Sequence, residues 1–227
     1  TAPEDTVVTG VELDETSSKI AKILHGDKHE INNSSLEQHI KNSEGEEYDL
    51  VIGNCPFGVR GITVMDDPDK IHLNKAEQYF VERGIDKLKE HGIMGMIVPT
   101  GIMDNSTWSD WRNDINKQAE FLGSFRMPTG VFHHAHAEVT TDIVFFRKRP
   151  AAASNFLVTA DSETIAKMKS MGIMDTEFTG GRFFEKNPEY ALGEQTTGQY
   201  GMKIWKGDFN IEELREKAGL FKPHKDN

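Results

Sequence analysis

The chain has 227 residues, of which 37% are hydrophobic and 28% are charged, and its formal net charge is −11 at pH 7. This length suits one large α/β domain, or one such domain with a small appendage. No apolar run reaches about 18 residues, so the sequence predicts no membrane span. The acidic balance argues against a chain that binds DNA alone, because phosphate contacts normally require a basic face.

Cys55 is the single cysteine, which excludes an internal disulfide framework and fits a reducing compartment, so a cytoplasmic location is expected. Residues 1–5 have neither the basic start nor the apolar core of a signal peptide. The sequence also begins without methionine, and we therefore expect a fragment of a longer protein.

The first predicted elements are a strand over residues 7–13 and a short helix behind it. Asp14 is a suitable N-cap for this helix, the helix has an apolar side, and Gly26 suits its end. A brief strand over residues 29–32 and a polar loop then precede a buried strand over residues 48–53.

A long amphipathic helix is predicted over residues 73–91, with Gly92 at its C-terminal stop. Its apolar residues recur at helical spacing: Ala76, Phe80, Ile85 and Leu88. A buried strand over residues 93–98 follows this helix and ends at Pro99.

A helix over residues 108–119 leads to a strand over residues 121–127, and a further strand over residues 139–146 follows without a helix between them. These last two strands are therefore expected to form an antiparallel pair at one edge of the sheet. Strands that alternate with helices at this spacing otherwise predict a mostly parallel, helix-covered sheet.

A change of composition over residues 151–154 predicts a linker. The linker divides the chain into residues 1–150, an α/β domain, and residues 151–227, a small α+β extension that ends in a helix over residues 211–220. The sequence contains no internal repeat.

The strand over residues 48–53 ends in Asn54, Cys55, Pro56 and Phe57. Ligands of open α/β sheets bind at the carboxyl ends of the strands, so this turn is a candidate site. Pro56 fixes its own φ and keeps Cys55 extended, which sets the Asn54 side-chain carbonyl and the Cys55 backbone carbonyl in place before a substrate arrives. Two such acceptors can bind the protons of an exocyclic amine and make its nitrogen more nucleophilic toward a sulfonium methyl group. Phe57 offers a face on which a flipped base can stack.

The motif alone is equally compatible with an ordinary Asn-x-Pro turn followed by a core phenylalanine. Glu12 adds context because it stands at the end of the strand over residues 7–13, where a carboxylate can accept hydrogen bonds from both hydroxyls of a ribose. Glu12 by itself would be read as a solvated acid, whereas a ribose acid together with a nitrogen-activating turn is much more specific.

The order of these pieces resembles the N6-adenine DNA methyltransferases of the gamma arrangement, whose Asn-Pro-Pro-Tyr/Phe motif reads Asn-Cys-Pro-Phe in this chain. It is most similar to the antirestriction-type methylase–helicase proteins of phages and mobile elements. The resemblance implies a Rossmann-like class I methyltransferase sheet, S-adenosylmethionine as methyl donor, DNA as substrate and a helicase domain as a partner. By family analogy alone, Arg126, Thr140 and Thr141 are expected near the catalytic face. The matching stretches span nearly the whole chain: residues 10–14, 49–58, 92–99, 122–128, 138–143 and 187–194.

Roles for five residues are implied by the same resemblance. Glu12, with Leu13 beside it, would hold the donor's ribose. Ser34 and Ser35 stand where the family commonly places a polar residue against the cofactor adenine. Cys55 departs from the family's usual proline, but its backbone carbonyl is the working group, so activity is expected to survive this change.

The family's glycine-rich cofactor loop should precede Glu12 by about twenty residues, and the sequence contains no such loop before this residue. Its strand would lie between the strands over residues 7–13 and 48–53, so the sheet is expected to lack a central strand and to expose two edges. Either these edges pair directly, a partner chain or N-terminal segment completes the sheet, or the domain is marginally stable. The chain alone is expected to bind the cofactor weakly or not at all.

His133, His134 and His136 could suggest a metal site, but a turn between edge strands lacks the rigid, supported ligands that zinc needs, so no metal is expected. Two rival functions remain open. The same turn serves methylation of a protein glutamine amide. A degenerate methyltransferase module used for binding or assembly would explain both the acidic charge and the absent cofactor loop.

Overall fold

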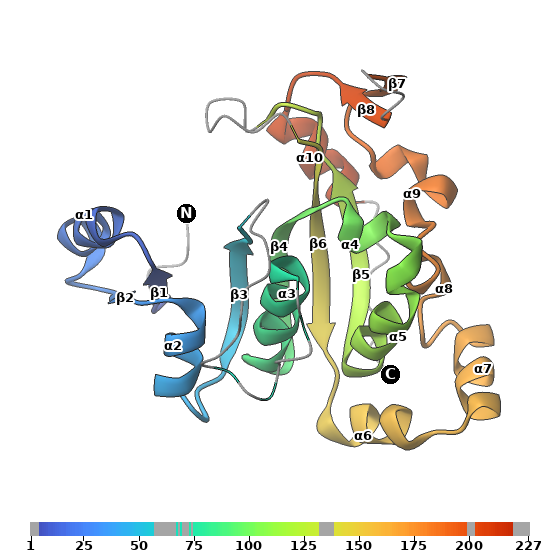
Figure 1. Ribbon diagram of the computed structural model, residues 1–227, viewed down its shortest axis with the longest axis horizontal. Coiled ribbons are helices and arrows are strands. Elements are labelled where there is room, and N and C mark those ends of the chain that lie inside the picture. Colours follow the sequence, from blue (N-terminus) through green and yellow to red (C-terminus); the bar gives the residue numbers. More distant parts are fainter. Residues whose placement is uncertain are drawn as a thin grey trace. The chain divides into compact units, whose positions relative to one another are not determined.

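The computed structural model describes residues 5–56, 67, 69, 73, 75–131, 139–198 and 203–219. The chain forms two compact units (Figure 1). Unit 1 consists of Thr1–Glu46 with Gly61–Asn74, and unit 2 consists of Glu47–Arg60 with Lys75–Asn227. None of the described helices combines the length and the apolar character that a bilayer crossing requires.

Unit 1 contains two parallel strands and two helices: β1 (Thr9–Glu12), α1 (Glu15–His25), β2 (Glu30–Asn33) and α2 (Leu36–Asn42). Asp14 is the N-cap of α1, where its side chain accepts a hydrogen bond from the Ser17 N–H, and Gly26 is the C-cap. The predicted strand–helix–strand order at the start of the chain is therefore confirmed, although β1 is shorter than the strand expected over residues 7–13.

Unit 2 is built around a four-stranded sheet with the strand order β3-β4-β6-β5. β3 is parallel to β4, whereas β6 is antiparallel to both β4 and β5. The antiparallel pair expected at one edge is thus confirmed, and the reversed strand lies between two strands that share the direction of β3. The sheet strands are β3 (Tyr48–Asn54), β4 (Leu88–Pro99), β5 (Ala119–Arg126) and β6 (Thr141–Lys148).

Helices connect these strands and continue beyond them. The connecting elements are α3 (Ala76–Asp86), α4 (Gly101–Asp104), η2 (Ser106–Trp108) and α5 (Ser109–Gln118). The C-terminal elements are α6 (Ala151–Thr159), α7 (Ser162–Ser170), α8 (Thr176–Thr179), α9 (Phe183–Lys186), η4 (Pro188–Tyr190), β7 (Glu194–Thr197), β8 (Lys203–Lys206) and α10 (Ile211–Ala218). These C-terminal elements include both helices and strands, and they belong to the same compact unit as the four-stranded sheet.

One face of the four-stranded sheet is covered by α3 and α5 (Figure 1). Gly84 lets α3 approach the sheet closely, since a Cβ at this position would lie 2.5 Å from the sulfur of Met94 and 3.6 Å from Val51 Cγ1. On the other face, Leu50 and Ile52 of the edge strand β3 are 58% and 75% exposed. The sheet is therefore packed on one side and apolar but uncovered near β3 on the other.

The C-terminal elements share the core of the sheet. Phe178 of α8 is fully buried and stacks on Phe121 of β5, with ring centroids 4.6 Å apart, and it meets Phe146 of β6 edge-on at 5.3 Å. Phe183 of α9 packs edge-on against the same Phe121 ring at 5.1 Å. Residues beyond 150 thus contribute rings to the same hydrophobic core as the strands, and the boundary at residue 150 stays a prediction.

The long helix predicted over residues 73–91 is wrong at its C-terminal end. α3 ends at Asp86, and Leu88 already belongs to β4, where it pairs with Tyr48. Helical spacing did not separate the two outcomes, because Leu88 is buried in the strand as it would be in a helix. Gly92 lies inside β4 and is therefore not a helix stop. A Cβ at this position would lie 3.0 Å from the Tyr48 carbonyl oxygen, so glycine lets the two strands approach closely.

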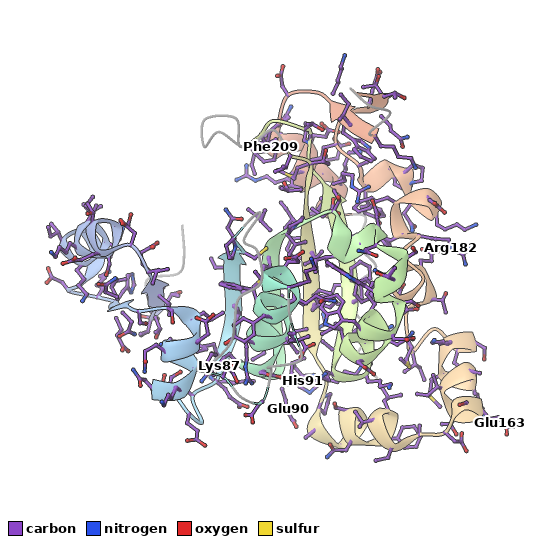
Figure 2. The ribbon with its side chains drawn as sticks, in the orientation of Figure 1. Lys87, Glu90, His91, Glu163, Arg182 and Phe209 are labelled. Carbon is purple, nitrogen blue, oxygen red and sulfur yellow. The ribbon has the colours of Figure 1, made fainter. Side chains whose placement is uncertain are left out.

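The linker predicted over residues 151–154 is also wrong, because these residues begin α6. Three consecutive alanines favour a helix, and Glu90 of β4 accepts a hydrogen bond from the Ala151 N–H at 2.7 Å. Figure 2 shows Lys87, Glu90 and His91 at the end of unit 2 where β4 begins. This end lies opposite to the carboxyl ends of β3 and β4.

Candidate active site

The candidate catalytic turn follows β3 at the carboxyl edge of the sheet. Asn54 is the last residue of β3 and is exposed, Cys55 is 1% exposed, and Pro56 is half-buried. The Cys55 N–H donates to the Ile97 carbonyl oxygen of β4 at 3.1 Å, so the turn is tied to the neighbouring strand. Phe57 lies outside the described residues. The described part of the turn places the exposed Asn54 side chain next to the buried Cys55, and the catalytic role of these residues stays a prediction.

The Cys55 thiol is chemically quiet. Burial raises its pKa to about 12, and the negative charge of Glu77 adds to this effect. The thiol is therefore neutral near pH 7 and fills space in the core, where it belongs to the main hydrophobic cluster. A nucleophilic role for Cys55 is inconsistent with this environment.

Alkylation is expected to report this burial. Iodoacetamide at pH 8 should modify Cys55 in the folded chain more slowly, by about a hundredfold or more, than in the urea-unfolded chain, because access and thiolate are both suppressed. The pKa in the folded state is about 12 and exceeds the ordinary 9.0, so the thiol favours folding below pH 9. This contribution is lost as the pH rises from 9 through 12. A mass-spectrometric time course that found equal alkylation rates in the folded and the unfolded chain would contradict the burial of the Cys55 thiol.

Unit 1 presents a carboxylate at the carboxyl end of β1. Glu12 is half-buried, and one of its carboxylate oxygens accepts a hydrogen bond from the Asp14 N–H at 2.8 Å. Asn33, at the end of β2, donates from its side chain to the carbonyl oxygens of Glu12 and Leu13 at 2.9 and 3.1 Å. The Leu13 side chain is 72% exposed. The Glu12 carboxylate is thus held in a fixed direction beside an exposed apolar side chain.

The two serines after β2 differ in their bonding. Ser35 is the N-cap of α2, and its hydroxyl accepts a hydrogen bond from the Gln38 N–H at 3.2 Å. The Ser34 hydroxyl is buried and has no hydrogen-bond partner within the described residues. The Ser34 hydroxyl is therefore the better candidate for a polar contact with a ligand, while Ser35 already has a structural task. Asn33 directly precedes these serines, and the sequence did not predict that its side chain ties the ends of β1 and β2 together.

A buried ion pair occupies the carboxyl edge of unit 2 at the end of β5. Arg126 donates to both carboxylate oxygens of Asp142 at 2.8 Å and forms an ion pair with Asp104 at 2.8 Å. The guanidinium carbon lies 4.2 Å from the ring centroid of Phe184 and 4.6 Å from that of Trp205. Burial raises the pKa of Asp142 to about 6, against the lowering effect of the Arg126 charge.

This arrangement joins β5, β6 and α4 to the C-terminal elements α9 and β8. The sequence places Arg126 near this edge only by analogy, and nothing in the residue spacing predicts its ion pair. The three histidines considered as metal ligands, His133, His134 and His136, lie outside the described residues.

The sequence of this chain matches a known protein family. The model of the Eco57I restriction-modification methylase family matches residues 5–132. The chain belongs to this family. The match covers β1 through β5, and with them both the Glu12 carboxylate and the turn from Asn54 to Pro56.

The chain is also similar to Defense against restriction protein B of Escherichia phage P1, with 31% identity over 221 residues. That similarity covers 97% of this chain but 10% of the phage protein. The chain therefore spans about a tenth of the length of this relative.

Two solved structures share the fold. The M protein of the type I restriction enzyme EcoKI has 17% identity and a TM-score of 0.53, covering 94% of this chain and 52% of that chain. A protein of Listeria monocytogenes assigned to the class I S-adenosylmethionine-dependent methyltransferases has 18% identity and a TM-score of 0.50, covering 65% of this chain and 46% of that chain. The class I methyltransferase fold implied by the sequence is thus confirmed.

Proposed function

We propose that this chain is part of an S-adenosylmethionine-dependent enzyme that methylates adenine N6 in DNA, in a restriction-modification or antirestriction setting. The observation that carries the proposal is the turn from Asn54 to Pro56 at the carboxyl end of a parallel strand, fixed to β4 through the Cys55 N–H, in a member of the Eco57I family. A cytoplasmic location is part of the proposal and fits the free thiol of Cys55.

The turn would activate the acceptor nitrogen by positioning and by hydrogen bonding. When bound, S-adenosylmethionine supplies an electrophilic methyl group on a sulfonium. The Asn54 side-chain oxygen and the Cys55 carbonyl oxygen would accept hydrogen bonds from the two N–H groups of the amine. These bonds would direct the nitrogen lone pair at that methyl carbon. Formation of the N–C bond would break the methyl–sulfur bond and leave S-adenosylhomocysteine, and one amine proton would pass to solvent. Phe57 would stack on the flipped adenine, and the chemistry requires no ionised Cys55.

The residues of unit 1 fit the ribose and adenine parts of this donor. The Glu12 carboxylate has a fixed direction and free capacity for hydroxyl donors, Leu13 offers an apolar surface, and the buried hydroxyl of Ser34 lacks a partner among the described residues. The capping role of Ser35 makes its contribution secondary. These observations support a donor-binding role for unit 1.

Further polypeptide is part of the proposal. β3 has a strand partner on one side only within the described residues, and its outward side chains Leu50 and Ile52 are exposed. We propose that a parallel strand from an N-terminal segment or a partner chain pairs with β3 and brings the glycine-rich cofactor loop. We call this complete enzyme the assembled methylase. DNA contacts, including those of a helicase domain, would come from its other parts, which the acidic charge of this chain supports.

Replacing Glu12 by glutamine is expected to weaken S-adenosylmethionine binding by the assembled methylase about tenfold or more, since charge-assisted hydrogen bonds to the ribose are lost. Calorimetric titration measures this effect. Glu15→Gln is the matched control, because Glu15 is exposed on α1 and forms a surface ion pair with Lys19. Equal affinities of the two variants would remove Glu12 from the donor site.

The proposed function is tested by incubating the assembled methylase and methyl-labelled S-adenosylmethionine with unmodified DNA or with a glutamine-containing peptide. The proposal predicts label in the DNA alone. Label in the peptide would favour the protein glutamine methyltransferase. Absence of transfer to either acceptor, with S-adenosylmethionine at saturation, would favour a degenerate module used for binding.

A further inference from the structure

Thr141, the first residue of β6, has an unusual hydroxyl. The residue is 1% exposed, yet its Oγ1 has no hydrogen-bond partner in the part of the chain that the structure describes. A buried hydroxyl without a partner loses its hydration and gains nothing in return, so such groups are rare and require an explanation. The arrangement around Thr141 offers one.

The backbone around this hydroxyl is immobilised by other bonds. The Thr141 carbonyl oxygen accepts from the Met127 N–H at 2.8 Å. The preceding residue, Thr140, has its hydroxyl 2.6 Å from that of Thr129. The following residue, Asp142, is fixed by its bidentate ion pair with Arg126. These neighbouring polar groups have partners of their own, and none of them bonds to the Thr141 hydroxyl in the described part of the chain.

The register places Thr141 on the same sheet face as Asn54. Asn54 pairs with Ile97, Ile97 pairs with Ile143, and Thr141 precedes Ile143 by two residues on β6. Residues two apart on a strand point to the same face. The direct neighbour of Thr141 is Pro99, which has no N–H to offer. Asn54 and Thr141 therefore flank the carboxyl edge from strands two positions apart, about 10 Å across the strands and a further 6–7 Å, roughly, along them.

We propose that Thr141 is a substrate-binding residue whose hydroxyl donates a hydrogen bond to a ring-nitrogen acceptor of the target base. This inference rests on the proposed function and deepens it. Asn54 and Cys55 would hold the amine of the base by acceptors, while Thr141 would supply a donor from β6 to a nitrogen of the same ring. Entry of the base would replace the groups that cover the hydroxyl and give Oγ1 its missing partner. The pairing of a donor with two acceptors selects a base that has both an amine and a ring-nitrogen acceptor.

The test replaces Thr141 by valine, which keeps the shape and removes the hydroxyl. In the assembled methylase, Thr141→Val is expected to raise the KM for DNA about five- to tenfold, with kcat changed by less than about twofold. Its Tm without DNA should be unchanged or higher, because an unsatisfied polar group is removed.

The matched control is Ser124→Ala, which also removes a buried hydroxyl from the sheet. Ser124 Oγ donates to the Ile143 carbonyl oxygen at 3.0 Å, so this variant should lower Tm by about 2–4 °C and leave the KM for DNA unchanged.

Three outcomes overturn the inference: an unchanged KM for Thr141→Val, a fall in Tm that matches the loss of activity, or equal KM effects of both variants. Absence of transfer by the unsubstituted enzyme would overturn the proposed function itself and this inference with it. Transfer by the unsubstituted enzyme that Thr141→Val fully retains would overturn the inference alone.

Discussion

Asn54→Ala is expected to reduce kcat for methyl transfer by the assembled methylase about 10²–10³-fold. The variant loses the side-chain carbonyl that would accept an amine proton in the transition state, and removal of one such preorganised group has this size of effect. Asn54 is exposed at the end of β3, so its loss should leave the fold intact. Affinity for S-adenosylmethionine should stay within about twofold, because this residue is assigned to the acceptor side. Steady-state kinetics with separate donor and DNA titrations measure both quantities.

Asn155→Ala is the matched control for this change. Asn155 is an exposed asparagine on α6, and its side chain has no part in the proposed site. The control should retain full activity. A fall in donor affinity with unchanged kcat for Asn54→Ala would move Asn54 from the acceptor side to the cofactor side.

Phe178→Ala is expected to lower the free energy of unfolding by about 3–5 kcal/mol. Phe178 is fully buried between Phe121 and Phe146, so alanine would leave a large cavity at the centre of the core. Phe156→Ala is the control, since Phe156 is 52% exposed on α6 and should change stability by no more than about 0.5 kcal/mol. Urea denaturation of the chain, followed by tryptophan fluorescence, measures both values.

This comparison also bears on the domain boundary predicted at residue 150. If the residues after 150 form an independent extension, the chain cut after Pro150 should keep its stability, and Phe178→Ala should cost little. The packing of Phe178 and Phe183 against Phe121 instead predicts that the truncated chain unfolds. A stable, folded fragment of residues 1–150 would restore the sequence-based boundary.

The strands of the four-stranded sheet could be predicted from the sequence because each contains a short apolar run that ends at a polar or basic residue or at a proline. The helix α1 was equally clear, since Asp14 and Gly26 mark its two ends. The start of β4 was not, because Leu88 is buried in either conformation and only its pairing with Tyr48 decides between them. The start of α6 at Ala151 is also supported by a hydrogen bond that the Ala151 N–H donates to Glu90, 61 residues earlier, and a contact over this distance could not be read from the local composition.

Part of the candidate site could be predicted from the sequence, and part of it could not. The turn from Asn54 to Pro56 could be found because its working groups are adjacent in the sequence. The partner of Arg126 is Asp142, 16 residues away, and only the strand register brings them together. The unsatisfied hydroxyl of Thr141 is a property of its surroundings rather than of the residue, so the sequence could place it near the edge by analogy but could not single it out.

The central claim is that the carboxyl edge of this sheet directs a methyl group to adenine N6. The most direct measurement is nucleoside analysis by mass spectrometry of DNA treated with the assembled methylase and methyl-labelled S-adenosylmethionine. The account predicts that the label appears as N6-methyladenine and disappears with Asn54→Ala. Label recovered as N4-methylcytosine or 5-methylcytosine, or N6-methyladenine formed equally well by Asn54→Ala, would contradict it.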